Sequence, residues 1–425
     1  MPVRVLVNYM LFPLLLVATA FNLRYRLTGA EIHLGGAELS IAPYDIFLFL
    51  ILVSIIFFSK QINLEKIKID RITAIAIFFV VLSSVSIINS EAVSFTVYEI
   101  FRHWKIIVLF LVVRSVFQDG KSMEKFTTVA ALLILFETLY AAYQLATGDV
   151  TEDAQQVKEL FVENGITRVT GTLRHPALLS LFTVLLLPFC VYGAVNGKGR
   201  LLYIGAIAAG FVVICLTYSR TQIVLYFFVV GLCLFYFKRP NGSSILRNKK
   251  IIYTSVIFSL VIMAGAIYNL ENLYARFFDA PESSTTSRLI LAKIALNMFV
   301  EHPLIGVGWN NFVDVMEQYD EFGASKSFRY PAHNMYLLVM AETGLIGIVS
   351  YLALIFGIYK IHKNTIKRGG DVSVNNASAA ALVSIIAILI TGIQGWSFRA
   401  DSIQAIIWIN FGIICALNDR AKRHA

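Results

Sequence analysis

His333 and Asn334 stand where a long polar segment gives way to a hydrophobic run, and Gly344 and Gly347 follow after a nine-residue interval. An imidazole titrates near neutral pH, so it can accept a proton from a hydroxyl group under working conditions. At a membrane surface it can reach both a water-soluble glycan and a lipid headgroup. A polar interfacial role for His333 and close helix packing at the two glycines are the simpler alternatives. We take His333 as the candidate general base and Asn334 as its candidate support.

Four arginines at predicted membrane borders are the candidates for binding an anionic group. They are Arg168, Arg174, Arg220 and Arg288. Guanidinium groups form paired hydrogen bonds with phosphate oxygens and stay charged, so several together would suit a diphosphate. Arg288 is expected at a helix start, where free N–H groups and the helix dipole add to the attraction. A border arginine can instead reach headgroup phosphates or pair with an acid, but almost no loop surrounds Arg220 to explain a charge there.

Glu137 and Glu342 fall inside predicted membrane spans, where an ionisable side chain is a functional candidate by default. Each could support the site. Each could equally be a hydrogen-bonded structural group or the partner of an arginine.

The composition predicts an all-α polytopic membrane protein with one integral domain over residues 1–425. The chain is 57% hydrophobic and 15% charged, whereas soluble domains carry about 25% charged residues. A span needs about 20 mostly apolar residues. Reading along the chain gives twelve candidates: 5–23, 44–59, 72–90, 105–118, 126–146, 176–196, 201–219, 222–237, 251–269, 335–358, 377–395 and 403–418. The first lacks a small-residue cleavage pattern, so we expect it to be a retained helix.

The distribution of charge predicts that both termini face the cytoplasm. With that orientation, 22 of the 36 basic residues and only six of the 27 acidic residues lie inside, as the positive-inside rule requires. The basic excess is therefore a topology signal and does not indicate nucleic-acid binding. The four cysteines all fall in predicted spans without metal-ligand spacing, and we interpret them as packing residues.

Two long segments are then extracytoplasmic, at residues 147–175 and 270–334. The second lies between spans nine and ten, and Ser and Thr at 283–287 supply N-cap candidates for an amphipathic helix over 288–301. His302 and Pro303 should end that helix, and a second short helix is expected at about 311–321. The segment is thus predicted to be a folded helical cap. The absence of an apparent repeat argues mildly against a transporter.

The residues that carry these signals resemble a known family. His333-Asn334, nine residues and Gly344-x-x-Gly347 match the signature His-[Asn/Ser/Gln]-x9-Gly-x-x-[Gly/Thr/Tyr] of bacterial O-antigen ligases. The wider O-antigen ligase/polymerase superfamily tends to show Arg-x-x-Gly, Ser-Arg-[Ser/Thr/Gly], Ser-Arg and Pro-x-x-Gly-x-Gly in this order. Here they stand at 168–171, 219–221, 287–288 and 303–308. One departure is Ala177 after Pro176, where the family commonly has asparagine.

The resemblance implies a GT-C-like, metal-independent and inverting glycosyltransferase without a cofactor. It would move a glycan from undecaprenyl diphosphate to a lipid A-core hydroxyl at the periplasmic face of the bacterial inner membrane. His333 would be the base, Arg220 and Arg288 would bind the diphosphate, and Arg168 and Arg174 would be secondary. A polymerase with a lipid-linked glycan acceptor, a protein-directed oligosaccharyltransferase and a lipid or polysaccharide transporter are the alternatives. No Asp-x-Asp cluster occurs in the outside loops, which favours chemistry without a metal.

Overall fold

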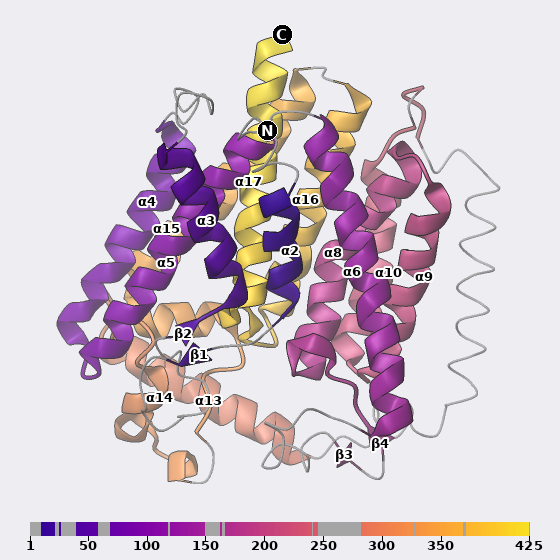
Figure 1. Cartoon of the computed structure of the whole chain (residues 1–425). Coiled ribbons are helices and arrows are strands. Elements are labelled where there is room, and N and C mark those ends of the chain that lie inside the picture. The colour runs from indigo at the N-terminus through magenta and orange to yellow at the C-terminus, as the bar shows by residue number, and fades with distance from the viewer. Residues whose placement is uncertain are drawn as a thin grey trace.

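The protein is a bundle of long helices (Figure 1). The computed structural model describes residues 10–21, 25–26, 40–57, 69–117, 120–148, 162–163, 166–239, 241–244, 282–326, 329–368 and 371–424. Two-residue strands form two antiparallel pairs, β1 (Tyr25–Arg26) with β2 (Ser40–Ile41) and β3 (Val162–Glu163) with β4 (Ile166–Thr167). The predicted all-α polytopic membrane fold is confirmed.

The helices follow the apolar runs, because a backbone in hydrocarbon must satisfy its own hydrogen bonds. Before residue 240 they are α2 (Phe12–Ala20), α3 (Pro43–Phe57), α4 (Arg71–Ser84) with the 3₁₀ turn η3 (Val85–Asn89), α5 (Val93–Val116), α6 (Gly120–Thr147), η5 (Gly171–Leu173), α8 (Pro176–Asn196), α9 (Arg200–Leu216) and α10 (Arg220–Tyr236). After residue 281 they are α13 (Glu282–Glu301), α14 (Phe312–Val315), η7 (Met316–Tyr319), η8 (Ala324–Lys326), α15 (Met335–Lys367), α16 (Val372–Thr391), η9 (Ser397–Arg399) and α17 (Asp401–His424).

Eleven of the twelve predicted spans overlap described helices, and the ninth, at 251–269, lies outside the described residues. Six described helices have the length and apolar composition to cross a membrane: Arg71–Asn89, Gly120–Thr147, Pro176–Asn196, Met335–Lys367, Val372–Thr391 and Asp401–Arg423. Helices α3, α9 and α10 supply shorter apolar stretches. α17 is at the centre of the bundle and packs on α5, α15 and α16. Its apolar stretch is completely buried.

The predicted first residue of the fourth span, 105–118, was wrong. α5 begins at Val93 and includes Glu99 and Arg102, both almost completely buried. Arg102 lies 3.3 Å from Glu99 and 3.4 Å from Asp401 of α17. These partners explain how charges excluded from a simple hydropathy pattern can lie inside the bundle.

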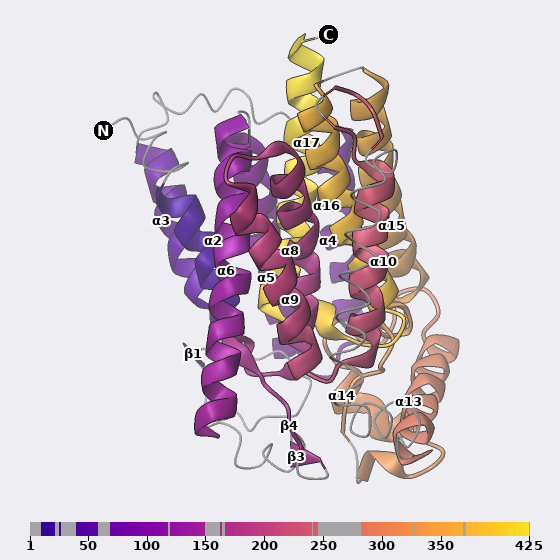
Figure 2. The same cartoon turned by 90° about the vertical axis from the view of Figure 1, so that its right-hand side faces the viewer.

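Residues 282–326 form a cap at one end of the bundle, opposite the C-terminal end of α17 (Figures 1 and 2). The cap has its own apolar core, in which Leu291, Met298 and Phe312 are buried. α13 begins six residues before the predicted start at 288 and ends at Glu301, as expected from His302 and Pro303. The predicted helix at 311–321 is α14 followed by η7.

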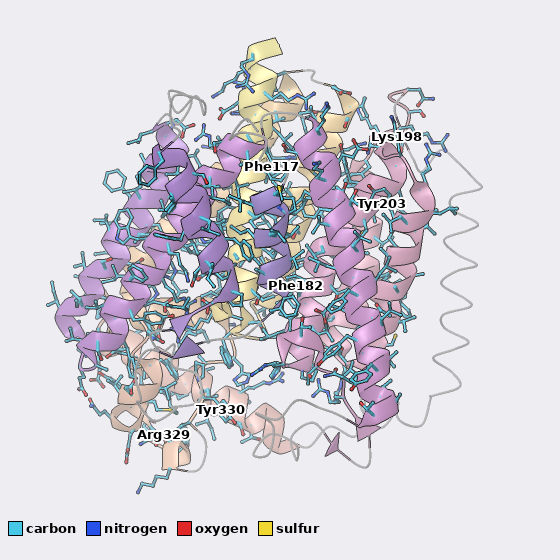
Figure 3. The ribbon with its side chains drawn as sticks, in the orientation of Figure 1. Phe117, Phe182, Lys198, Tyr203, Arg329 and Tyr330 are labelled. Atoms are coloured by element: carbon cyan, nitrogen blue, oxygen red, sulfur yellow. The ribbon has the colours of Figure 1, made fainter. Side chains whose placement is uncertain are left out.

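The two predicted extracytoplasmic segments are described in part. Residues 149–161 and 164–165 of the first lie outside the described residues, as do 270–281 and 327–328 of the second. Figure 3 shows Arg329 and Tyr330 at the cap end of the molecule and Lys198 at the opposite end.

Candidate active site

His333 precedes the first turn of α15 at the cap end, and Asn334 caps that helix. The Asn334 Oδ1 accepts hydrogen bonds from the N–H groups of Tyr336 and Leu337 at 2.9 and 3.0 Å. Its Nδ2 donates to the Ile393 carbonyl at 3.2 Å. Asparagine is among the preferred N-cap residues because its side chain replaces a missing backbone acceptor. Asn334 therefore holds the backbone next to the His333 imidazole in place.

The His333 imidazole is half-buried beside a positive charge. Among the described residues, its Nδ1 has no partner at good hydrogen-bond geometry, and the Tyr330 ring lies edge-on at 6.5 Å between centroids. Burial first, and then the Arg288 guanidinium, lower the pKa of His333 to about 4, while the backbone of Pro331 opposes the shift. The imidazole is therefore uncharged at neutral pH and able to accept a proton.

The structure places Arg288 close enough to His333 to lower its pKa. Arg288 is not at the start of a helix, however, as the sequence predicted. Because α13 begins at Glu282, Arg288 lies in its second turn. Its N–H group is no longer one of the free groups at a helix start. The expectation of a helix-dipole contribution at Arg288 was wrong, and its exposed side chain contributes its own charge.

Arg220 begins α10 after a tight turn, as expected. α9 ends at Leu216, and Tyr218 adopts a positive φ of 51° within the turn. The next residue, Thr221, donates from its hydroxyl to Gln394 Oε1 at 2.7 Å. Gln394 follows Ile393, whose carbonyl binds Asn334. Arg220 begins α10, and His333 directly precedes the N-cap of α15. The starts of these two helices are therefore attached to adjacent residues of one loop.

Arg168 and Arg174 lie on a segment that packs against the α9–α10 turn. The Arg168 Nε donates to the Thr217 carbonyl at 2.9 Å, and the Val169 N–H donates to the Leu216 carbonyl at 3.3 Å. Arg174 is half-buried and has a positive φ of 58° just before α8. The segment thus places Arg168 next to the turn that leads into Arg220.

The Glu137 side chain of α6 hydrogen-bonds to the backbone of this same segment. It accepts from the Thr172 N–H at 3.1 Å and from the Thr172 hydroxyl. Gln144, two turns further along α6, accepts from the N–H groups of Thr170 and Gly171 at 3.1 and 2.9 Å. Gly171 has a φ of 58°, and a side chain there would overlap the Glu137 carboxylate. The glycine of the Arg-x-x-Gly motif therefore permits this close approach.

Glu342 is buried on α15 and pairs with Arg399 of η9. Its Oε1 also accepts from the Phe312 N–H at 3.2 Å, and Arg399 donates to Asn310 Oδ1 at 3.3 Å. Glu342 therefore connects the cap to the bundle.

Gly344 breaks α15 with φ 64° and ψ −164°. The turn at 303–308 inserts beside this break. The N–H groups of Leu345 and Ile346 donate to the Pro303 and Leu304 carbonyls at 2.8 and 3.2 Å. In return, the N–H groups of residues 307 and 308 donate to carbonyls 341 and 342 at 3.0 and 3.1 Å. The Gly-x-x-Gly and Pro-x-x-Gly-x-Gly motifs are therefore two halves of one backbone junction.

Sequence reasoning missed the buried charges around this junction. They are Glu99, Arg102, Arg399 and Asp401. A signal existed for the first two, which have the i, i+3 spacing of a helical ion pair just before an apolar run. No comparable local spacing joins Arg399 to Glu342, which is 57 positions away.

The fold defines a polytopic α-helical membrane protein with a helical cap at the end that carries the candidate histidine and arginines. Residues 177–352 match the family model described as O-antigen ligase, and this match supports the O-antigen ligase/polymerase superfamily. The matched range contains Arg220, Arg288, His333, Asn334 and Glu342. The matched family implies enzyme activity of the glycosyltransferase or ligase type. No curated protein matches the chain.

Proposed function

We propose that this protein is an O-antigen ligase that transfers a glycan from undecaprenyl diphosphate to a lipid A-core hydroxyl. The observation that carries the proposal is the half-buried His333 imidazole, whose pKa is lowered by burial and by the Arg288 guanidinium. Arg220 begins a helix attached to the same loop as the His333 segment. A base and fixed positive charges at one end of a membrane bundle suit transfer from a lipid diphosphate.

In the proposed reaction, His333 takes the proton of the acceptor hydroxyl as its oxygen attacks the anomeric carbon. The bond between that carbon and the diphosphate oxygen breaks, and the electron pair stays on the diphosphate. Arg220 and Arg288 stabilise the developing negative charge, with Arg168 and Arg174 in support. Attack from the face opposite the leaving group inverts the anomeric centre.

We further propose that the site faces the periplasm. Tyr330, three residues before His333, lies at the cap end, whereas Lys198 lies at the opposite end (Figure 3). The C-terminal end of α17, with Arg420, Lys422 and Arg423, also lies opposite the cap (Figure 1). Basic residues concentrate on the cytoplasmic side of membrane proteins, which supports a periplasmic cap.

A two-acceptor reaction tests the ligase assignment. Purified protein is supplied with an undecaprenyl-diphosphate glycan, lipid A-core and a second lipid-linked glycan, and the products are separated on a gel. We expect the glycan on lipid A-core. A ladder of elongated lipid-linked glycans would instead establish a polymerase, and movement of glycan across liposomes without a covalent product would establish a transporter.

The pH dependence of transfer should report the His333 pKa. In the free enzyme that pKa is about 4, so we expect kcat/KM to be flat from about pH 5.5 to 8 and to fall only as pH decreases toward 4, where the base becomes protonated. The bound diphosphate adds negative charge beside the imidazole, so the acid limb of kcat should lie at higher pH.

Arg288→Gln removes the neighbouring positive charge and should move the acid limb of kcat/KM to higher pH. Arg288→Lys keeps the charge and should leave the limb near its original position. An acid limb that is the same in wild type and both variants would show that Arg288 does not act on the base.

A further inference from the structure

The segment that joins α16 to α17 contacts the elements that carry the proposed site. We call it the crosspiece and count in it residues 391–401, from the last residue of α16 to the first of α17. The Gly392 carbonyl accepts from the Met335 N–H at 2.7 Å, and the Ile393 carbonyl accepts from Asn334 Nδ2 at 3.2 Å. A side chain at position 392 would meet the flexible end of the Met335 side chain, so Gly392 and Met335 pack closely. The first residues of the crosspiece therefore hold the start of α15, where His333 lies.

The next residue of the crosspiece holds the start of α10. Gln394 Oε1 accepts from the Thr221 hydroxyl at 2.7 Å, and Thr221 follows Arg220 directly. Successive Cα atoms are 3.8 Å apart in a trans peptide. Ile393 and Gln394 therefore bind the two helix starts one residue apart, which limits how far Arg220 and His333 can move relative to each other.

The far end of the crosspiece is anchored by buried charges. Arg399 pairs with Glu342 and donates to Asn310 Oδ1 at 3.3 Å. Arg102 donates to the Arg399 carbonyl at 2.7 Å and lies 3.4 Å from Asp401. Arg102, Glu342, Arg399 and Asp401 are each no more than 5% exposed. Separating a buried ion pair leaves an uncompensated charge. These pairs therefore hold the far end of the crosspiece in one position.

Aromatic contacts attach the middle of the crosspiece to the cap. Trp396 and Phe398 pack on the cap core together with Tyr330 and Leu337, which flank His333 in the chain. The crosspiece is thus fixed at both ends and in the middle, and Gln394 is exposed at the end nearest Arg220.

We propose that Gln394 is a positioning residue that, through Thr221, holds the Arg220 end of α10 in register with the His333 end of α15. This inference rests on the proposed function of those two residues. Gln394 makes no bond to the reacting atoms in this assignment. It sets the distance between the diphosphate-binding arginine and the base, and small errors in such alignment slow a reaction more than they weaken binding.

The test is a double-mutant cycle of Thr221→Val and Gln394→Ala, with kcat and donor KM measured for purified full-length protein. Each single change should lower kcat about three- to tenfold, the rate equivalent of one hydrogen bond, with donor KM within about twofold. The double variant should be no slower than the slower single variant, because one bond is lost in every case. Thr221→Ser keeps the hydroxyl and should restore nearly full kcat.

Gln318→Ala is the matched control, because Gln318 is also exposed and donates to Glu91 at 2.8 Å away from the crosspiece. Its kcat should be unchanged. Losses in kcat that multiply in the double variant, or an equal loss in Thr221→Ser, would overturn the positioning role.

Two further variants separate this inference from the proposed function. Arg220→Ala should raise donor KM, and His333→Ala should abolish transfer. Suppose that Arg220→Ala and His333→Ala give these results while the Thr221 and Gln394 variants keep wild-type kcat. Then only the positioning role of Gln394 fails. If His333→Ala is fully active, the proposed function fails.

Discussion

Replacing His333 by alanine should reduce the rate of glycan transfer at least about a hundredfold, because positioned general bases contribute about 10²- to 10⁴-fold. The loss should appear in kcat and in kcat/KM alike, since the proton transfer occurs only in the transition state. Purified protein, an undecaprenyl-diphosphate glycan and lipid A-core are sufficient to measure it. Binding of the donor should remain, because the four arginines are still present.

His302→Gln is the control for loss of an imidazole from the cap end. His302 lies near Asn89 and Tyr319, with ring nitrogens 3.3 and 3.0 Å from their side chains, and glutamine can hydrogen-bond to both. Most activity should remain in that variant. Full activity of His333→Ala in folded protein would refute the general-base role.

Replacing Gly344 by alanine should prevent the cap from docking on α15. The φ of 64° and ψ of −164° belong to a region that is essentially restricted to glycine. A methyl group there would also overlap the backbone of Leu304 and Ile305. Backbone strain of this kind costs up to about 3 kcal/mol even before the overlap is counted, so we expect a large fall in melting temperature and in activity.

Gly231→Ala provides the comparison, since a methyl group at that position in α10 meets no atom within 4 Å. Alanine favours helix more than glycine does, so this variant should be as stable as the wild type or slightly more stable. Thermal unfolding of the two detergent-purified variants, with limited proteolysis of the cap, measures the difference. A Gly344→Ala protein with wild-type stability would mean that the break in α15 is not required.

The helical spans could be predicted because their signal is local. Apolar runs of sufficient length allow few structures in a membrane, and eleven predicted spans overlap described helices. α5 shows the limit of that signal. Its early charged residues resemble a loop in the sequence, but Arg102 is buried against Asp401, 299 positions away.

The candidate site was predictable in its residue types and only partly in its geometry. His333, Asn334 and the glycines lie in one short stretch, so their pattern can be recognised without the fold. The start of α13 was misplaced by six residues, because helix ends depend on weak capping signals. The electrostatic effect of Arg288 on His333 depends on how the cap packs on α15.

The sequence by itself determined that this is a polytopic helical membrane protein and which arginines and histidine are candidates for chemistry. Only the tertiary structure decided that Gly344 is a helix break filled by the turn at 303–308, and that Gln394 connects the Arg220 and His333 helix starts. The physical reason is the separation along the chain of the residues that interact. Hydropathy and motif spacing act along the chain, whereas a hydrogen bond such as that from Thr221 to Gln394 joins atoms 173 positions apart, and no local pattern specifies such a pairing.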